Sequence, residues 1–189
     1  MNNQREQFQR LLLTSIRISI LGFLFVLLLF STERIIAQNN IFILATGGTI
    51  AGSQGSYDKP GYKAGSFNVQ DLIDAVPQLK DIANLKGEQI SNIGSQDMND
   101  TIWLKLGNRV NQLLAKPDVD GIVVTHGTDT FEETAYFLNL IVDSNKPVVM
   151  VASMRPATSI SPDGPMNLFM GVIVASCKEA NGKGVLCVM

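Results

Sequence analysis

Cysteine is scarce in this sequence of 189 residues, which contains only Cys177 and Cys187. Two cysteines exclude a disulfide-dense scaffold. The length suits a single domain. Cys187 lies in an apolar, strand-like run, and we therefore expect it to be part of the core.

Positive charge is also limited. The chain has 15 lysines and arginines against 17 aspartates and glutamates, a formal net charge of −2. Residues 1–37 hold four of the arginines and two of the glutamates, so their removal would change the charge from −2 to −4. No basic patch remains that could follow a phosphate backbone, and we expect no nucleic-acid partner.

The sequence is also poor in histidine and has no nucleotide-binding motif. The single histidine is His126, and no Ser-His-Asp arrangement is visible. An isolated histidine after a strand is typically a packed, hydrogen-bonded residue; a role as catalytic base is the alternative. The glycines follow neither G-x-G-x-x-G nor G-K-[ST], which disfavours a nucleotide-binding domain. We expect no cofactor and no metal ion.

The amino-terminal segment differs from the rest of the chain. Its arginines outweigh its glutamates and precede an apolar run at residues 18–30. That run has the length of a signal-peptide core and is short for a membrane span, and Ala37 is a small residue at a plausible cleavage point. We interpret residues 1–37 as a signal peptide or membrane anchor. The protein would then be periplasmic or secreted, or, as the alternative, anchored in the membrane by residues 11–30.

From Gln38 onward, apolar runs typical of buried parallel strands alternate with helical patterns. This alternation predicts an α/β fold, a doubly wound and mostly parallel sheet with helices on both faces. The expected strands are residues 41–45, 82–93, 121–125, 147–152 and 184–189.

Local signals place the expected helices. Asn68 is a suitable cap for a short helix, and Thr130 with Glu133 predicts a capping box for a later one. A further helix is expected over residues 167–180. Lys86-Gly87 is expected to interrupt the second strand. Residues 52–67 form a glycine-spaced loop with Tyr62, either a mobile lid or a disordered surface loop.

Polar turns follow three of the expected strands. They are Thr46-Gly47-Gly48-Thr49, the Gly94–Asp100 stretch and His126-Gly127-Thr128-Asp129. Open parallel sheets bind ligands at the carboxyl ends of their strands, so we expect a ligand site there. A threonine hydroxyl becomes a nucleophile once a base takes its proton. Asp129 could bind an amine or cap a helix, and Ser95 with the turn after it could bind a carboxylate.

Four segments resemble those of the bacterial L-asparaginases, in order along the chain. The likeness runs from about Asn40 to Met189 and is strongest to the exported type II enzymes and their glutaminase-asparaginase relatives. The segments are Ala45-Thr-Gly-Gly-Thr-Ile-Ala-Gly52, Gly94-Ser-Gln-Asp-Met-Asn-Asp100, Thr125-His-Gly-Thr-Asp-Thr-Phe-Glu-Glu-Thr134 and Ala152-Ser-Met-Arg-Pro156.

The resemblance implies hydrolysis of the side-chain amide of L-asparagine, with L-glutamine as a further candidate substrate. It makes Thr49 the nucleophile, assisted by Tyr62, with Thr128 and Asp129 as a second catalytic pair. An acyl-enzyme would form, release ammonia and be hydrolysed to aspartate.

The same resemblance assigns substrate binding. Ser95, Gln96, Thr128 and Asp129 match the residues that hold the α-carboxylate and α-amino groups of the amino acid. The full-length family is expected to form a homotetramer.

The sequence also departs from the family. The family's catalytic lysine lies beyond the fifth strand, where this sequence offers no residue to match it. Residues 38–189 would be an incomplete amino-terminal asparaginase domain, and the family's carboxyl-terminal domain is absent. The alternative to an active hydrolase is therefore a catalytically inactive domain that at most binds an acidic or amide amino acid.

Overall fold

The computed structural model describes Arg10 and residues 38–55 and 61–189. The chain divides into two compact units, Met1–Ala37 and Gln38–Met189, and the fold described below is that of the second. The predicted signal peptide or anchor lies outside the described residues. Among the residues that are described, no helix is long and apolar enough to cross a membrane.

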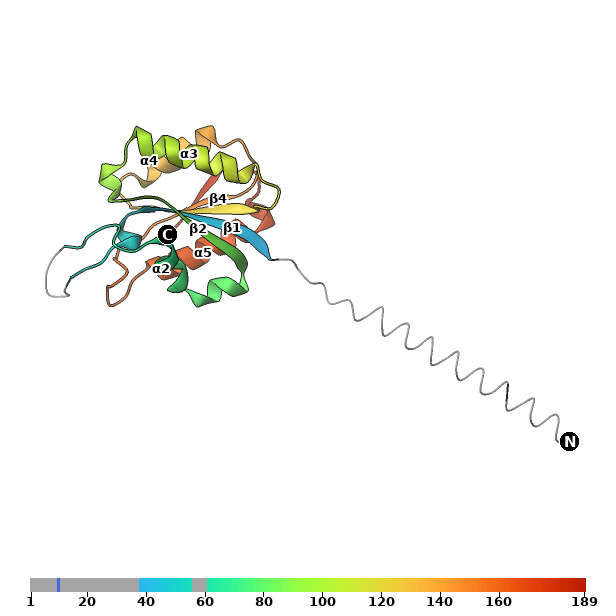
Figure 1. The fold of residues 1–189 in the computed structure, drawn as a ribbon, viewed down its shortest axis with the longest axis horizontal. Coiled ribbons are helices and arrows are strands. Elements are labelled where there is room, and N and C mark those ends of the chain that lie inside the picture. Colours follow the sequence, from blue (N-terminus) through green and yellow to red (C-terminus); the bar gives the residue numbers. More distant parts are fainter. Residues whose placement is uncertain (1–9, 11–37, 56–60) are drawn as a thin grey trace. The chain divides into compact units, whose positions relative to one another are not determined.

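A parallel sheet forms the centre of the second unit (Figure 1). Its order is β2-β1-β3-β4-β5, and every neighbouring pair is parallel. This confirms the predicted α/β class. The strands are β1 (Asn39–Gly47), β2 (Ala83–Ile93), β3 (Gly121–Thr125), β4 (Val148–Val151) and β5 (Val185–Val188).

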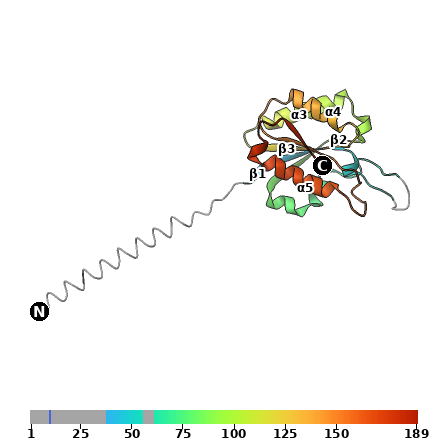
Figure 2. The same ribbon diagram turned by 180° about the vertical axis from the view of Figure 1, so that it is seen from behind.

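Helices cover both faces of the sheet, as two opposite views show (Figures 1 and 2). One face carries α3 (Asp100–Leu114) and α4 (Phe131–Ile141), whose buried leucines pack with the β1 and β3 residues Leu44, Ile122 and Val124. The other face carries α2 (Val69–Asp74) and α5 (Gly164–Ser176). The central strands β1, β3 and β4 are therefore buried on both sides, which explains their continuous apolar sequences.

Several local expectations hold. Asn68 caps α2 in a reciprocal capping box with Asp71, because each side chain bonds to the other residue's backbone amide. In contrast, β2 is not interrupted at Lys86-Gly87, which pair with Phe42 and Ile43. A Cβ added at Gly87 would lie 2.9 Å from a methyl of Val69, so this glycine lets α2 pack closely on an unbroken strand.

Three other expectations were wrong in detail. Thr130 precedes α4, but its hydroxyl donates to the Ser95 carbonyl and forms no capping box. The last long helix begins at Gly164, before Asn167, and ends at Ser176; a separate 3₁₀ turn follows at Lys178–Ala180. Cys187 is exposed because it belongs to β5, which is the last strand of the sheet in the described chain.

Candidate active site

The turns after β1 and β3 touch each other through their backbones. Gly48 has φ of 77°, and a Cβ added there would lie 2.4 Å from the Gly127 nitrogen. A Cβ on Gly127 would in turn lie 2.4 Å from the Ser95 hydroxyl oxygen, in the turn after β2. The two glycines thus allow three strand ends to converge, because any side chain would push them apart.

Thr49 lies at the centre of this convergence. It begins a short 3₁₀ turn, Thr49–Ala51, and is 5% exposed. Its hydroxyl oxygen is 2.5 Å from the Tyr62 hydroxyl oxygen, so the two share a short hydrogen bond. The loop that carries Tyr62 therefore returns to the residue predicted as nucleophile. Tyr62 itself is 48% exposed, which leaves the pair open to solvent.

Ser95 joins the turn after β2 to the turn after β3. Its buried hydroxyl accepts a hydrogen bond from the Asp129 amide at 3.0 Å. Its carbonyl accepts one from the Thr130 hydroxyl at 2.9 Å. Because the Ser95 oxygen is the acceptor of the Asp129 amide, its own proton remains available for donation. The Ser95 hydroxyl can therefore donate to an anionic group at this edge of the sheet.

The remaining predicted residues are more accessible. Thr128 is half-buried, whereas Asp129 and Gln96 are exposed. Within the described chain, no protein group hydrogen-bonds to the Thr128 hydroxyl or the Asp129 carboxylate. The Gln96 amide donates to the Asp97 carboxylate at 3.3 Å. The loop after β3 thus presents a free hydroxyl and a free carboxylate next to Ser95.

His126 is fully buried and held at both ring nitrogens. Nδ1 lies 2.7 Å from the Gly127 carbonyl, which can only accept, so Nδ1 carries the proton. Nε2 accepts a hydrogen bond from the Thr134 hydroxyl at 3.0 Å, and that hydroxyl in turn accepts one from the Trp103 indole at 2.7 Å. A consistent chain of donors then runs from Trp103 through Thr134 to His126 and Gly127.

Burial lowers the pKa of His126 below its ordinary value, although the Gly127 hydrogen bond and the Glu133 charge oppose this shift. A neutral imidazole whose acceptor nitrogen is already engaged by Thr134 is poorly suited to take a proton from Thr128. The structural interpretation of His126 is therefore confirmed. Its Nδ1 proton binds the Gly127 carbonyl at the start of the turn after β3.

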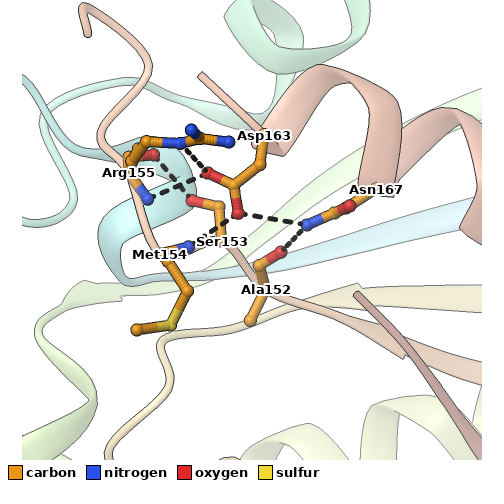
Figure 3. Close-up of polar contacts among 6 residues, drawn as sticks. All are labelled: Ala152, Ser153, Met154, Arg155, Asp163 and Asn167. Atoms are coloured by element: carbon orange, nitrogen blue, oxygen red, sulfur yellow. Dashed lines mark hydrogen bonds and ion pairs between the residues drawn. The ribbon is translucent and has the colours of Figure 1, made fainter. Parts of the chain in front are cut away.

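Sequence analysis missed a carboxylate that organises the loop after β4 (Figure 3). Asp163 accepts the amide hydrogens of Met154 at 2.8 Å and Arg155 at 2.9 Å, and the Arg155 side chain at 3.3 Å. Partial burial would raise the pKa of Asp163, but these hydrogen bonds outweigh it and lower the pKa overall. Asp163 directly precedes Gly164-Pro165, a helix-start pattern that could have indicated it.

Asn167 completes this arrangement. Its side-chain amide donates to the Ala152 carbonyl at 2.9 Å and lies 3.4 Å from the Asp163 carboxylate. The segment Ala152-Ser-Met-Arg-Pro156 is thereby tied to the first turn of α5. Among the described residues, no group of three or more histidine, cysteine, aspartate or glutamate side chains could hold a metal ion.

Comparison with known proteins agrees with this architecture. The family model "Asparaginase, N-terminal" matches residues 40–189. L-asparaginase 2 of Bacillus subtilis (strain 168) is 63% identical over 151 residues, 79% of this chain and 40% of the relative. A probable periplasmic L-asparaginase of Haemophilus influenzae (strain ATCC 51907 / DSM 11121 / KW20 / Rd) is 59% identical over 150 residues, with shares of 79% and 42%.

A solved structure extends the likeness to the fold. The crystal structure of a probable cytoplasmic L-asparaginase from Campylobacter jejuni superimposes with a TM-score of 0.78 at 52% identity, covering 80% of this chain and 46% of that one. The chain thus spans less than half the length of these relatives. Because the family model covers most of the sequence, from Asn40 to its last residue, the chain belongs to the asparaginase family.

Proposed function

We propose that this chain is the amino-terminal part of an exported L-asparaginase that hydrolyses the side-chain amide of L-asparagine, with L-glutamine as a second substrate. The observation that carries the proposal is the hydrogen bond between Thr49 and Tyr62 where the strand ends converge. A buried threonine hydroxyl that meets a phenol hydroxyl has a partner through which its proton can leave.

The reaction follows from this pair. The Thr49 oxygen forms a bond to the side-chain amide carbon, and its proton passes by way of Tyr62 to the departing nitrogen. The carbon–nitrogen bond breaks, ammonia leaves, and the aspartyl group stays on Thr49 as an ester. Water then attacks that ester and restores the threonine hydroxyl. Thr128 and Asp129 form the second catalytic pair, in which the Thr128 hydroxyl would donate a hydrogen bond at the reacting group.

The substrate is held by its α-groups. The Ser95 hydroxyl proton and the Gln96 amide would donate to the α-carboxylate, and the exposed Asp129 carboxylate would bind the α-ammonium. The Thr128 hydroxyl provides a further polar contact. Backbone amides in the converging turns could stabilise the oxyanion of the tetrahedral intermediate.

The test removes the nucleophile and keeps its shape. In Thr49→Val we expect ammonia release from L-asparagine to fall by several orders of magnitude, as when a nucleophile is lost in other hydrolases. Calorimetric binding of L-aspartate should persist, because Ser95 and Asp129 are unchanged. Thr49→Ser, which keeps a hydroxyl, is the matched control. Near-normal turnover by Thr49→Val would show that Thr49 is not the nucleophile and would assign that role to Thr128.

A second candidate is a domain that binds the amino acid without turning it over. It is favoured by the Thr128 hydroxyl and the Asp129 carboxylate, to which no protein group in the described residues is hydrogen-bonded. The assay is therefore run on the 189-residue chain and on any longer product of the gene. Binding of L-aspartate without ammonia release from either would support this second candidate. The homotetramer is proposed for the longer product alone, and gel filtration would test it.

Export is proposed from the amino-terminal pattern of charge followed by an apolar run. Removal of residues 1–37 would give a mature protein that begins near Gln38, in the periplasm or outside the cell; retention of residues 11–30 would anchor it. Amino-terminal sequencing of the protein from separate cell fractions distinguishes the cleaved form from the anchored form. A soluble cytoplasmic product that still begins at Met1 would contradict both.

A further inference from the structure

The loop that carries Tyr62 returns through a short two-stranded stem, which we call the Tyr62 stem and define as residues 52–54 and 62–63. Ser53 and Lys63 exchange both backbone hydrogen bonds, at 3.0 and 2.8 Å. The Tyr62 ring lies against Gly52, because a Cβ added there would be 2.9 Å from the ring. The position of the Tyr62 hydroxyl therefore depends on where this stem lies.

The other side of the stem is paired with the loop after β4. The Ala157 amide donates to the Gly52 carbonyl at 3.0 Å, and the Gln54 amide donates to the Thr158 hydroxyl at 2.8 Å. The Thr158 hydroxyl thus accepts the Gln54 amide hydrogen in the way that a backbone carbonyl of a third paired strand would. Residues 52–54 are bound on both sides, by Lys63 on one and by Ala157 and Thr158 on the other.

The loop that supplies Ala157 and Thr158 is itself closed at its ends. Asp163 holds the Met154 and Arg155 amides, and Asn167 holds the Ala152 carbonyl (Figure 3). Gly164 follows Asp163 in the sequence and lies against Ile50, since a Cβ added at Gly164 would be 2.9 Å from the Ile50 side chain. Ile50 follows Thr49 in the 3₁₀ turn, so the first residue of α5 packs against the turn that carries the candidate nucleophile.

We propose that Thr158 is a positioning residue for Tyr62. Its hydroxyl, fixed by the Asp163 closure of the loop after β4, holds the Tyr62 stem so that the Tyr62 hydroxyl meets Thr49. This inference rests on the proposed function only for its effect on turnover. The support of the stem is a property of the folded chain and can be measured without an assay of activity.

The test compares Thr158→Val, which removes the acceptor, with Thr158→Ser, which restores a hydroxyl. Ser159→Ala, at the adjacent residue, is the matched control. The first readout is amide hydrogen exchange at Gln54 in the folded chain, and the second is the ring NMR signal of Tyr62, assigned with Tyr62→Phe. We expect Thr158→Val to speed exchange at Gln54 by about five-fold or more and to shift or broaden the Tyr62 signal.

Thr158→Ser and Ser159→Ala should match the wild type in both readouts, and circular dichroism should show each variant folded. In any product that hydrolyses asparagine, Thr158→Val should lower kcat by about ten-fold with little change in KM. An unchanged Tyr62 signal in Thr158→Val would overturn the inference. A shifted signal in a longer gene product without asparaginase activity would support the positioning and count against the proposed function alone.

Discussion

At the scale of single residues, the buried polar side chains of Ser95 and His126 beside the candidate site are hydrogen-bonded to their neighbours. His126 illustrates this, because both ring nitrogens have partners and burial lowers its pKa. The sequence contains no other histidine. Any histidine titration that contributes to stability therefore comes from this one residue, which makes its effect measurable.

We predict that stability falls as the pH decreases below about 6.5, the ordinary histidine pKa. The pKa of folded His126 is lower than that of the unfolded chain, so the unfolded chain binds more protons in the window between the two values. The free energy of unfolding is then highest above this window and declines within it, by at most about 1.4 kcal/mol per pH unit. Urea unfolding at a series of pH values from about 7.5 to about 5.5 measures the slope.

The control for this prediction is His126→Gln, which removes the titrating group. Its unfolding free energy should depend less on pH over the same range, whatever its absolute stability. Equal slopes for the wild type and the variant would show that His126 does not set the pH dependence.

Single residues also show the limit of sequence analysis at the site. Thr49 and Ser95 were predicted as site residues from their turns at strand ends, and Tyr62 was predicted from the family resemblance of its loop. Thr158 could not be predicted, because its partner Gln54 is 104 residues away along the chain. A hydroxyl that accepts one amide hydrogen bond produces no periodic pattern and no fixed residue spacing by which the sequence would reveal it.

At the scale of elements, the site depends on how closely the turns after β1 and β3 approach. Gly48 and Gly127 are in backbone contact, and Gly48 has a positive φ. The order of strands and helices was predictable, since each has its own apolar pattern. The expected Thr130 capping box and the expected break in β2 were wrong because the outcome depends on partners from other elements: Ser95 binds Thr130, and Val69 packs against Gly87.

We predict that Gly48→Ala destabilises the fold by roughly 2 kcal/mol or more, since an alanine at positive φ costs about 1 to 2 kcal/mol and the new methyl group adds overlap. The methyl would lie 2.4 Å from the Gly127 nitrogen, so one of the two turns must move. Asparagine turnover, where present, should fall as well, because Thr49 follows directly. Urea unfolding and ammonia release measure the two effects.

Gly55→Ala is the matched control for this substitution. Among the residues that the structure describes, none apart from its chain neighbours lies within 4 Å of a Cβ added at Gly55. Its stability should therefore remain close to that of the wild type. A loss as large as that of Gly48→Ala would mean that the contact between the turns is not the cause.

At the scale of the whole unit, residues 38–189 contain the structural requirements of a stable α/β layer. Two apolar clusters lie on opposite faces of the sheet, one under α3 and α4 and one under α2 and α5. Every strand of the sheet pairs with at least one neighbour in the described chain. Folding of this unit and completeness of its chemistry are separate questions, because neither apolar cluster includes Thr128 or Asp129.

We predict that residues 38–189, expressed alone, fold cooperatively but release ammonia from L-asparagine far more slowly than a complete asparaginase. Thr49 and Tyr62 are already in contact, whereas no protein group in the described residues bonds to the Thr128 hydroxyl or the Asp129 carboxylate. Positioning of reacting groups can contribute many powers of ten in rate, so an unsupported second pair should limit turnover. Circular dichroism and urea unfolding test the fold, and ammonia release tests the chemistry. A folded sample with turnover comparable to that of a complete asparaginase would show that the Thr49–Tyr62 pair and its neighbours suffice.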